Sequence, residues 1–310
     1  MGSGMILIFL LFAAGLILLV KGADVAVRGA EGLAFRFGVS ATTIGLTVVA
    51  FGTSLPEFFV TTEAFSTGNT DIGLANIVGS NIANIGLILA LCVLISPTLT
   101  TSVHLRPRFL KDSLLMLAAT LLFAAFSLRG VLDWITGIAF LLFFAGILLF
   151  IRKNSRGDPG SEPPVVRYPL FKTIAGLLAV VLGSHLLIMA AVGMAELFSI
   201  PPYVIGISLV AVGTSLPELA TSVVAALKNS PAISVGNIVG SNIFNILFIL
   251  GANALFFTVP SPGYTDILVM TGFAAGIFGL YLGKQWQTRV WAIVLLAAYG
   301  IFIAVLYGAV

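Results

Sequence analysis

The sequence has few charged residues and almost no cysteine or histidine. Asp, Glu, Lys and Arg make up 9% of the 310 residues, whereas soluble domains carry about 25%, and the mean hydropathy is +1.14. The single cysteine, Cys92, excludes a disulfide framework and a thiolate metal site. Two histidines without an HExxH pattern argue against a metalloenzyme. We therefore expect a membrane protein that is not an enzyme and has no organic cofactor.

Ten apolar runs are each long enough to cross a bilayer, which takes about 20 helical residues. They predict an all-α membrane protein with ten transmembrane helices. The predicted spans lie near residues 5–27, 41–66, 72–97, 109–127, 131–151, 170–196, 203–226, 232–257, 265–283 and 289–308.

Positive charge is distributed unevenly between the two sets of alternate loops. If the N-terminus is outside, all 15 Lys and Arg residues except Arg129 and Lys21 fall in the inner loops. This bias predicts a multi-pass protein of the cell (plasma) membrane with both termini extracellular. It also accounts for the pI near 9.1, so the basic balance does not indicate nucleic-acid binding.

The chain contains an internal repeat at a constant offset of 161 residues. The segment 45–57 (GLTVVAFGTSLPE) matches 206–218 (GISLVAVGTSLPE) at nine of 13 positions, and 76–84 (NIVGSNIAN) matches 237–245 (NIVGSNIFN) at eight of nine. The offset is too long for a solenoid repeat. Two homologous halves therefore make up the chain.

These halves are predicted to span residues 5–152 and 169–308, with 153–168 as a polar cytoplasmic linker loop. Each half has five spans, an odd number, so the second half enters the membrane from the opposite side. The result is a pair of inverted-topology five-helix repeats, an arrangement typical of secondary transporters. In such proteins, interrupted helices at matching positions of the two halves indicate the binding site.

Each GTSLPE motif places a glutamate, Glu57 or Glu218, inside an apolar run. A carboxylate at membrane depth costs roughly 3 kcal/mol even on lenient scales, and no basic residue is available at that depth to pair with it. Pro56 lacks an N–H and leaves the Gly52 carbonyl without its helical partner. In the second motif Pro217 does the same to the Gly213 carbonyl. Such backbone is tolerated in a membrane only where it is buried in protein or lines a cavity. The motifs therefore predict a cation site at two helix breaks.

The side chains around each glutamate supply oxygen ligands. Thr53 and Ser54 precede Glu57 by four and three residues, so their oxygens share one helix face. Ser80 and Asn84 are four apart, as are Ser241 and Asn245. Carboxylate, hydroxyl, amide and carbonyl oxygens suit hard ions such as Ca²⁺ or Na⁺, not zinc or copper. Two ionised glutamates carry about −2, which one Ca²⁺ or two Na⁺ would neutralise.

Other polar residues in the spans have more ordinary interpretations. Asn76 and Asn237 are at least as well explained by interhelical hydrogen bonds or pore lining as by ligation. Lys21 and Asp24, three apart in the first span, are expected to form a local ion pair. His185 is expected to be a hydrogen-bonded packing residue, with a proton relay as the alternative.

At these motifs the chain resembles the sodium/calcium exchanger family, within the calcium:cation antiporter superfamily, and specifically its compact prokaryotic or archaeal members. The signatures are GTSLPE and GSNIxN, one pair in each half. The resemblance implies a core of the second, third, seventh and eighth helices around four adjacent cation sites, gated by sliding of the first and sixth helices. It also implies Ca²⁺ extrusion driven by electrogenic Na⁺ entry, with Ca²⁺ and Na⁺ as transported ions. We further expect the protein to function as a monomer.

Carried over onto this sequence, the resemblance implies an ion-ligand set of ten side chains and two backbone carbonyls. The side chains are Glu57, Thr53, Ser54, Ser80 and Asn84 from the first half and Glu218, Thr214, Ser215, Ser241 and Asn245 from the second, and the carbonyls are those of Ala50 and Ala211.

One departure from the family pattern bears on the coupling ion. Many members carry Asp where this chain has Asn84 or Asn245, so here only the two glutamates bring negative charge.

The leading hypothesis is Na⁺/Ca²⁺ antiport by alternating access. A Ca²⁺/H⁺ antiporter, or another cation/proton antiporter on the same fold, and a passive cation channel remain as alternatives.

Overall fold

The computed structural model describes residues 2–105, 107–155, 166–197, 211–281 and 284–308, nearly all of them helical. The first half comprises α1 (Gly2–Phe37), α2 (Ala41–Ile44), η1 (Gly45–Val49), α3 (Ala50–Thr53), α4 (Leu55–Ser66), α5 (Thr70–Ala83), η2 (Asn84–Leu89), α6 (Ala90–Ile95), α7 (Pro97–Leu105), α8 (Pro107–Ser127), β1 (Val131–Leu132) and α9 (Trp134–Asn154). The second half comprises α10 (Pro169–Leu197), α12 (Ala211–Thr214), α13 (Leu216–Leu227), α14 (Pro231–Ile243), η4 (Phe244–Leu250), α15 (Gly251–Ala254), β2 (Val259–Pro260), α16 (Tyr264–Gly276), η5 (Ile277–Tyr281) and α17 (Gln285–Gly308).

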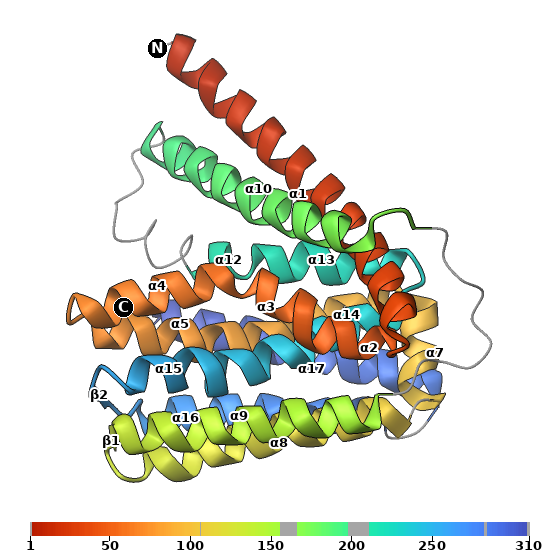
Figure 1. Ribbon diagram of the computed structural model, residues 1–310. Helices are drawn as coiled ribbons and strands as arrows, with labels where there is room; N and C mark the ends of the chain where they lie inside the picture. Colours follow the sequence, from red (N-terminus) through yellow and green to blue (C-terminus); the bar gives the residue numbers. More distant parts are fainter. Residues whose placement is uncertain (1, 106, 156–165, 198–210, 282–283, 309–310) are drawn as a thin grey trace.

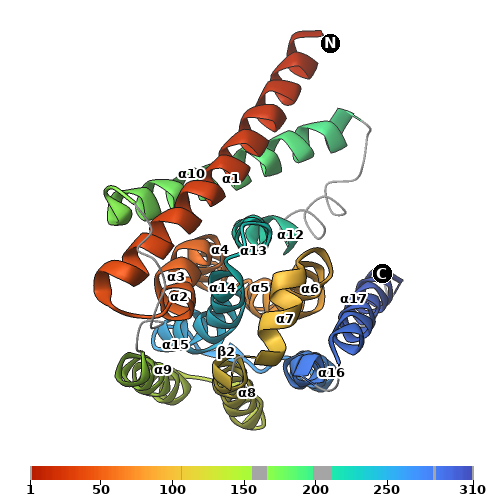
Figure 2. The ribbon, with the colours of Figure 1, turned by 90° about the vertical axis from the view of Figure 1, so that its right-hand side faces the viewer.

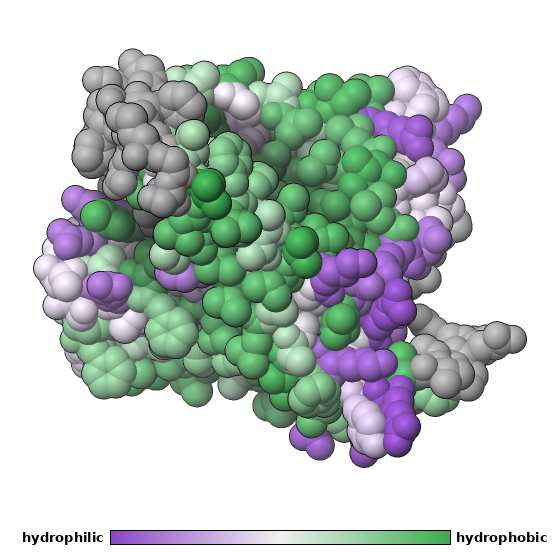
Figure 3. Space-filling model, turned by 90° about the horizontal axis from the view of Figure 1, so that it is seen from above, coloured by the Kyte–Doolittle hydropathy of each residue, from purple (hydrophilic) through white to green (hydrophobic). Residues whose placement is uncertain are grey.

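The described helices confirm the predicted all-α membrane fold. Eight of them are long and apolar enough to span a bilayer, and a bent pair, 41–53 with 55–66, provides a ninth. The predicted seventh span, 203–226, lies partly outside the described residues, which resume at Ala211. Figure 3 shows a broad hydrophobic band between hydrophilic residues at the two ends of the molecule, as a bilayer-spanning protein requires.

The first helix is longer than predicted, because α1 continues to Phe37 and does not end near residue 27. Its additional turns carry Ala30, Leu33 and Ala34, which are buried in a cluster with Ile44 of α2 and Ile233 of α14. The spacing of these side chains places them on one helix face. Packing of that face against the core explains the extension.

Two matched helix breaks divide the motif-bearing spans. In the first half α3 ends at Thr53, α4 begins at Leu55, and the two axes differ by 46°. In the second half α12 ends at Thr214 and α13 begins at Leu216. Each proline occupies the first turn of the following helix, where its missing N–H has no helical role. The predicted discontinuities are therefore confirmed.

The two halves run in opposite directions through the molecule (Figure 1). α2, α3 and α4 progress from the right of the view to the left, whereas α12 and α13 progress from left to right. α1 and α10 are likewise antiparallel and lie together on one side of the helical core (Figure 2). A two-stranded pairing of β1 with β2 joins the halves on the opposite side of the core from α1 and α10.

Glycines allow the central helices of the two halves to touch through their backbones. A Cβ at Gly236 of α14 would lie 2.6 Å from the Thr42 carbonyl oxygen, and one at Gly240 would lie 2.5 Å from that of Leu46. Both distances are far below van der Waals contact. Small residues thus bring α14 against α2 and η1 at the centre of the molecule.

This close approach predicts that Gly240→Ala destabilises the protein by about 1–3 kcal/mol, a typical cost of overpacking. At Gly79, its counterpart 161 residues earlier, an added Cβ would have no heavy atom within 4 Å, so Gly79→Ala is the matched control. Thermal unfolding of both variants in detergent measures the difference. Equal melting temperatures would contradict the proposed backbone contact.

Candidate functional site

The two helix breaks meet π-helical turns of neighbouring helices. η2 begins at Asn84, directly after α5, and η4 contains Asn245, directly after α14. π-Helical turns inside α-helices occur frequently at functional sites. Each GSNIxN motif therefore ends where its helix widens, and each GTSLPE motif lies where its helix is interrupted.

The ten predicted ligand side chains are all buried, each at most 6% exposed. They are Thr53, Ser54, Glu57, Ser80, Asn84, Thr214, Ser215, Glu218, Ser241 and Asn245. Burial of two carboxylates with this many hydroxyl and amide groups in an apolar protein requires compensating polar contacts.

The hydroxyl groups contact the glutamate of the opposite half. Ser54 Oγ donates to Glu218 Oε1 at 2.7 Å, and Ser215 Oγ donates to Glu57 Oε1 at 3.5 Å. Two further bonds extend these contacts: Ser241 Oγ donates to Glu218 Oε1 at 3.3 Å, and Ser215 Oγ donates to Ser80 Oγ at 3.3 Å. The structure thus joins the two motif pairs into a single site, with each carboxylate bound across the boundary between halves.

Four buried acceptor oxygens in this site have no hydrogen-bond partner. They are Glu57 Oε2, Glu218 Oε2, Asn84 Oδ1 and Asn245 Oδ1, a set that is symmetric under the 161-residue repeat. In the part of the chain that the structure describes, neither glutamate forms an ion pair with a basic residue. Buried polar atoms normally find partners. Bound cations would supply the partners that these oxygens lack.

Asn76 and Asn237 hold in place the two threonines of the predicted ligand set. Thr53 Oγ1 donates to Asn237 Oδ1 at 3.1 Å, and Thr214 Oγ1 donates to Asn76 Oδ1 at 3.2 Å. Asn76 Nδ2 also donates to the Glu57 carbonyl at 3.3 Å. The two asparagines therefore orient residues of the opposite half. In the sequence, this role is indicated only by the recurrence of an asparagine at the first position of each NIVGSN segment.

The two predicted carbonyl ligands lie at the starts of the short helices before the breaks. Ala50 begins α3, and its carbonyl accepts from Ser54 N at 3.0 Å and from Thr53 Oγ1 at 3.3 Å. Ala211 begins α12. The carbonyl of Gly213, freed by Pro217, accepts from Ser184 Oγ of α10 at 3.0 Å.

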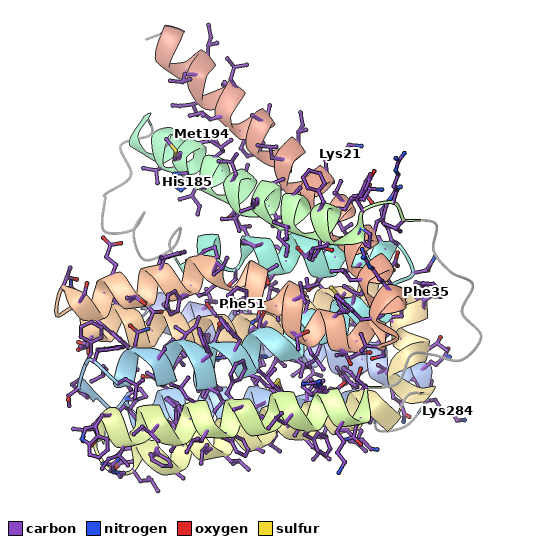
Figure 4. The ribbon with its side chains drawn as sticks, in the orientation of Figure 1. Lys21, Phe35, Phe51, His185, Met194 and Lys284 are labelled. Carbon is purple, nitrogen blue, oxygen red and sulfur yellow. The ribbon has the colours of Figure 1, made fainter. Side chains whose placement is uncertain are left out.

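Several polar residues of the sequence lie away from this site. Lys21 projects from the outer side of α1 and His185 lies on α10 (Figure 4); both are exposed. The predicted Lys21–Asp24 ion pair is wrong, since Asp24 bonds to Arg28 at 3.0 Å and contacts Lys228 of the second half. The expectation that His185 is a hydrogen-bonded packing residue is not supported, because its side chain is exposed on α10.

Comparison with known proteins identifies the family of the chain. A sequence profile of the family described as sodium/calcium exchanger protein matches residues 7–153 and, separately, residues 169–308. The chain belongs to the sodium/calcium exchanger family. It is therefore a multi-pass transporter of a cation/Ca²⁺ antiporter family and not an enzyme, and the family profile occurs once in each half.

Similar proteins match most or nearly all of the chain. The sodium/calcium exchanger MaX1 of Methanosarcina acetivorans is 32% identical over 353 residues, covering 96% of this chain and 98% of its own length. The inner membrane protein YrbG of Escherichia coli is 36% identical over 280 residues, covering 85% of this chain and 83% of its own length. A structure of the sodium-calcium exchanger NCX_Mj soaked with 2.5 mM Na⁺ and 0.1 mM Ca²⁺ has a TM-score of 0.85 at 35% identity, covering 96% of this chain and 98% of that one.

Proposed function

We propose that this protein exchanges Na⁺ for Ca²⁺ across the cell membrane by alternating access. The observation that carries the proposal is the group of four unpartnered oxygens around Glu57 and Glu218. In this all-oxygen site, the ten predicted side chains and the carbonyls of Ala50 and Ala211 bind the transported ions. Such a donor set fits Ca²⁺ and Na⁺.

Charge balance explains why exchange is obligatory. The two carboxylates are buried, and the described part of the chain offers them no basic partner. An ion-free site with charge −2 is costly to seal away from water on both sides. One Ca²⁺ or two Na⁺ removes that charge. The loaded protein can therefore pass through an occluded state, and the empty protein resists doing so.

The repeat supplies the alternation between sides. The two repeats comprise residues 5–152 and 169–308, joined by the cytoplasmic linker 153–168, and they can exchange conformations about the site between them. α1 begins and α17 ends at the same end of the molecule (Figure 1), while Lys284 and other basic residues gather at the opposite end (Figure 4). The positive-inside rule then places both termini outside the cell.

Ion gradients imposed one at a time on proteoliposomes test the proposal. An outward Na⁺ gradient is expected to drive ⁴⁵Ca²⁺ uptake at constant pH, and a pH gradient without Na⁺ is not. Uptake driven only by the pH gradient would overturn Na⁺ coupling and favour Ca²⁺/H⁺ antiport through the same glutamates. Unitary currents in a planar bilayer would overturn antiport itself.

A further inference from the structure

The helices α1 and α10 form a close pair on one side of the core (Figure 2). Glycines bring their backbones into contact: a Cβ at Gly176 would lie 2.4 Å from the Ala26 nitrogen, and one at Gly183 would lie 2.5 Å from the Leu19 nitrogen. There is no room for one helix to change its packing on the other without separating them. The two helices are therefore expected to move as one body, called the outer pair below.

The outer pair crosses both helix breaks. Leu177 of α10 covers Gly52, since a Cβ there would lie 2.5 Å from Leu177 Cδ1. Seven residues further along α10, Ser184 Oγ donates to the Gly213 carbonyl at 3.0 Å. This is the carbonyl that Pro217 leaves without a helical partner. Ser184 is 3% exposed, so the bond is shielded from water and links the outer pair directly to the second motif.

Two further polar contacts fasten α1 to the second half. Asp24 forms an ion pair with Lys228, at the C-terminal end of α13, and Glu31 accepts a hydrogen bond from Ser230, which precedes α14. Among the described residues, the polar contacts of the outer pair with the core thus end on second-half residues. Its packing against the first half is apolar, as where Leu177 covers Gly52 and joins a buried cluster that includes Ile44.

The 161-residue repeat determines what becomes of these contacts when the two halves exchange conformations. In the exchanged state each residue takes the place of its repeat partner. Where Ser184 bonds to Gly213 in this state, Ala23 faces Gly52 after the exchange. Likewise His185 and Thr67 take the places of Asp24 and Lys228. Val192 and Asn69 take the places of Glu31 and Ser230. No charge pair and no hydroxyl donor to the freed carbonyl exists in those combinations.

We propose that Ser184, Asp24 and Glu31 are positioning residues that make the two access states unequal, by fastening the outer pair to the second half in this state only. The inference rests on the alternating-access part of the proposed function. The loss of one buried hydrogen bond changes an equilibrium about 2- to 10-fold, and the loss of a partly exposed ion pair changes it at most about 5-fold. The state described here is favoured by these factors combined.

The sharpest test adds a contact to the exchanged state without removing one from this state. Ala23→Ser provides the hydroxyl that would face the Gly52 carbonyl after exchange. Spin labels on cysteines introduced at Leu16 of α1 and Leu142 of α9, 45% and 69% exposed, in a Cys92→Ala background, report the position of the outer pair. The distance distribution between them gives the ratio of the two states without any transport assay.

Ala23→Ser and Ser184→Ala are each expected to increase the exchanged population about 2- to 10-fold, and their combination to multiply the two effects. Lys228→Gln shifts the ratio in the same direction. Ser184→Thr keeps the hydroxyl and the wild-type ratio, and Arg129→Gln, which removes an ion pair with Asp133 remote from the outer pair, leaves it unchanged. An unchanged distribution in both Ala23→Ser and Ser184→Ala would overturn the proposal.

This measurement is separate from the test of Na⁺/Ca²⁺ exchange. If Ca²⁺ uptake were coupled to protons alone, the assignment of Na⁺ as the coupling ion would be refuted. The role of the three positioning residues would still be tested by the distance populations. Conversely, Na⁺-driven uptake with insensitive distance populations would refute only the role of the three positioning residues.

Discussion

Glu57→Gln abolishes Ca²⁺ exchange while the protein remains folded. The substitution keeps the shape of the side chain and removes one of the two formal charges of the site. Removing one partner of a buried charge interaction costs about 2–5 kcal/mol, which corresponds to roughly 30- to 5,000-fold weaker binding. Glu218→Gln is expected to behave in the same way, because the repeat gives the two carboxylates equivalent places. Ca²⁺ flux into proteoliposomes at neutral pH measures the effect.

Glu63→Gln is the matched control for this prediction. Glu63 lies on the same helix, α4, and its side chain is exposed. Its replacement removes the same charge from the protein without altering the buried site, so the Ca²⁺ flux should stay within a small factor of wild type. If Glu57→Gln retained full Ca²⁺ flux in a folded protein, or if Glu63→Gln reduced the flux equally, the site assignment would fail.

Asn245→Asp changes the ion requirement of the site. Asn245 is 1% exposed and its Oδ1 has no hydrogen-bond partner, so a third carboxylate there would raise the charge of the site from about −2 to −3. One Ca²⁺ then leaves a net negative charge, which a proton or an additional Na⁺ must neutralise before occlusion. We expect a steeper dependence of exchange on Na⁺ concentration and a new dependence on pH.

Na⁺ and pH titrations of ⁴⁵Ca²⁺ uptake in wild-type and Asn245→Asp proteoliposomes check this expectation. Asn253→Asp is a suitable control, because Asn253 is also buried but bonds to the Ile249 carbonyl of its own helix. Identical Na⁺ and pH profiles in wild type and Asn245→Asp would show that residue 245 does not face the transported ions.

The repeat made much of the fold and of the site predictable. Matched motifs at one offset identify two halves, and the prolines of those motifs mark the helix breaks at Thr53–Leu55 and Thr214–Leu216. The two glutamates were predicted as a pair because the repeated GTSLPE motif places one in each half. Each was predicted to be functional because a carboxylate at membrane depth is costly. These inferences depend on local sequence and on its duplication, both of which are visible without a structure.

The contacts between halves were not predictable in the same way. Spacing along one helix groups Ser54 with Glu57, yet the Ser54 hydroxyl bonds to Glu218, because the break at Ser54 separates it from the helix that carries Glu57. Spacing also paired Asp24 with Lys21, whereas the fold brings Lys228 to Asp24 from the other half. Such contacts depend on how inverted halves pack together, and no periodicity within one helix encodes that arrangement.

The central claim is that Na⁺ and Ca²⁺ occupy in turn one site built around Glu57 and Glu218. Equilibrium binding of ⁴⁵Ca²⁺ to the purified protein in detergent, with Na⁺ as competitor, tests it most directly. We expect saturable Ca²⁺ binding that Na⁺ displaces completely in the wild type and that is absent from the folded Glu57→Gln/Glu218→Gln double variant. Ca²⁺ binding that persists in the double variant, or that Na⁺ does not displace from the wild type, would contradict it.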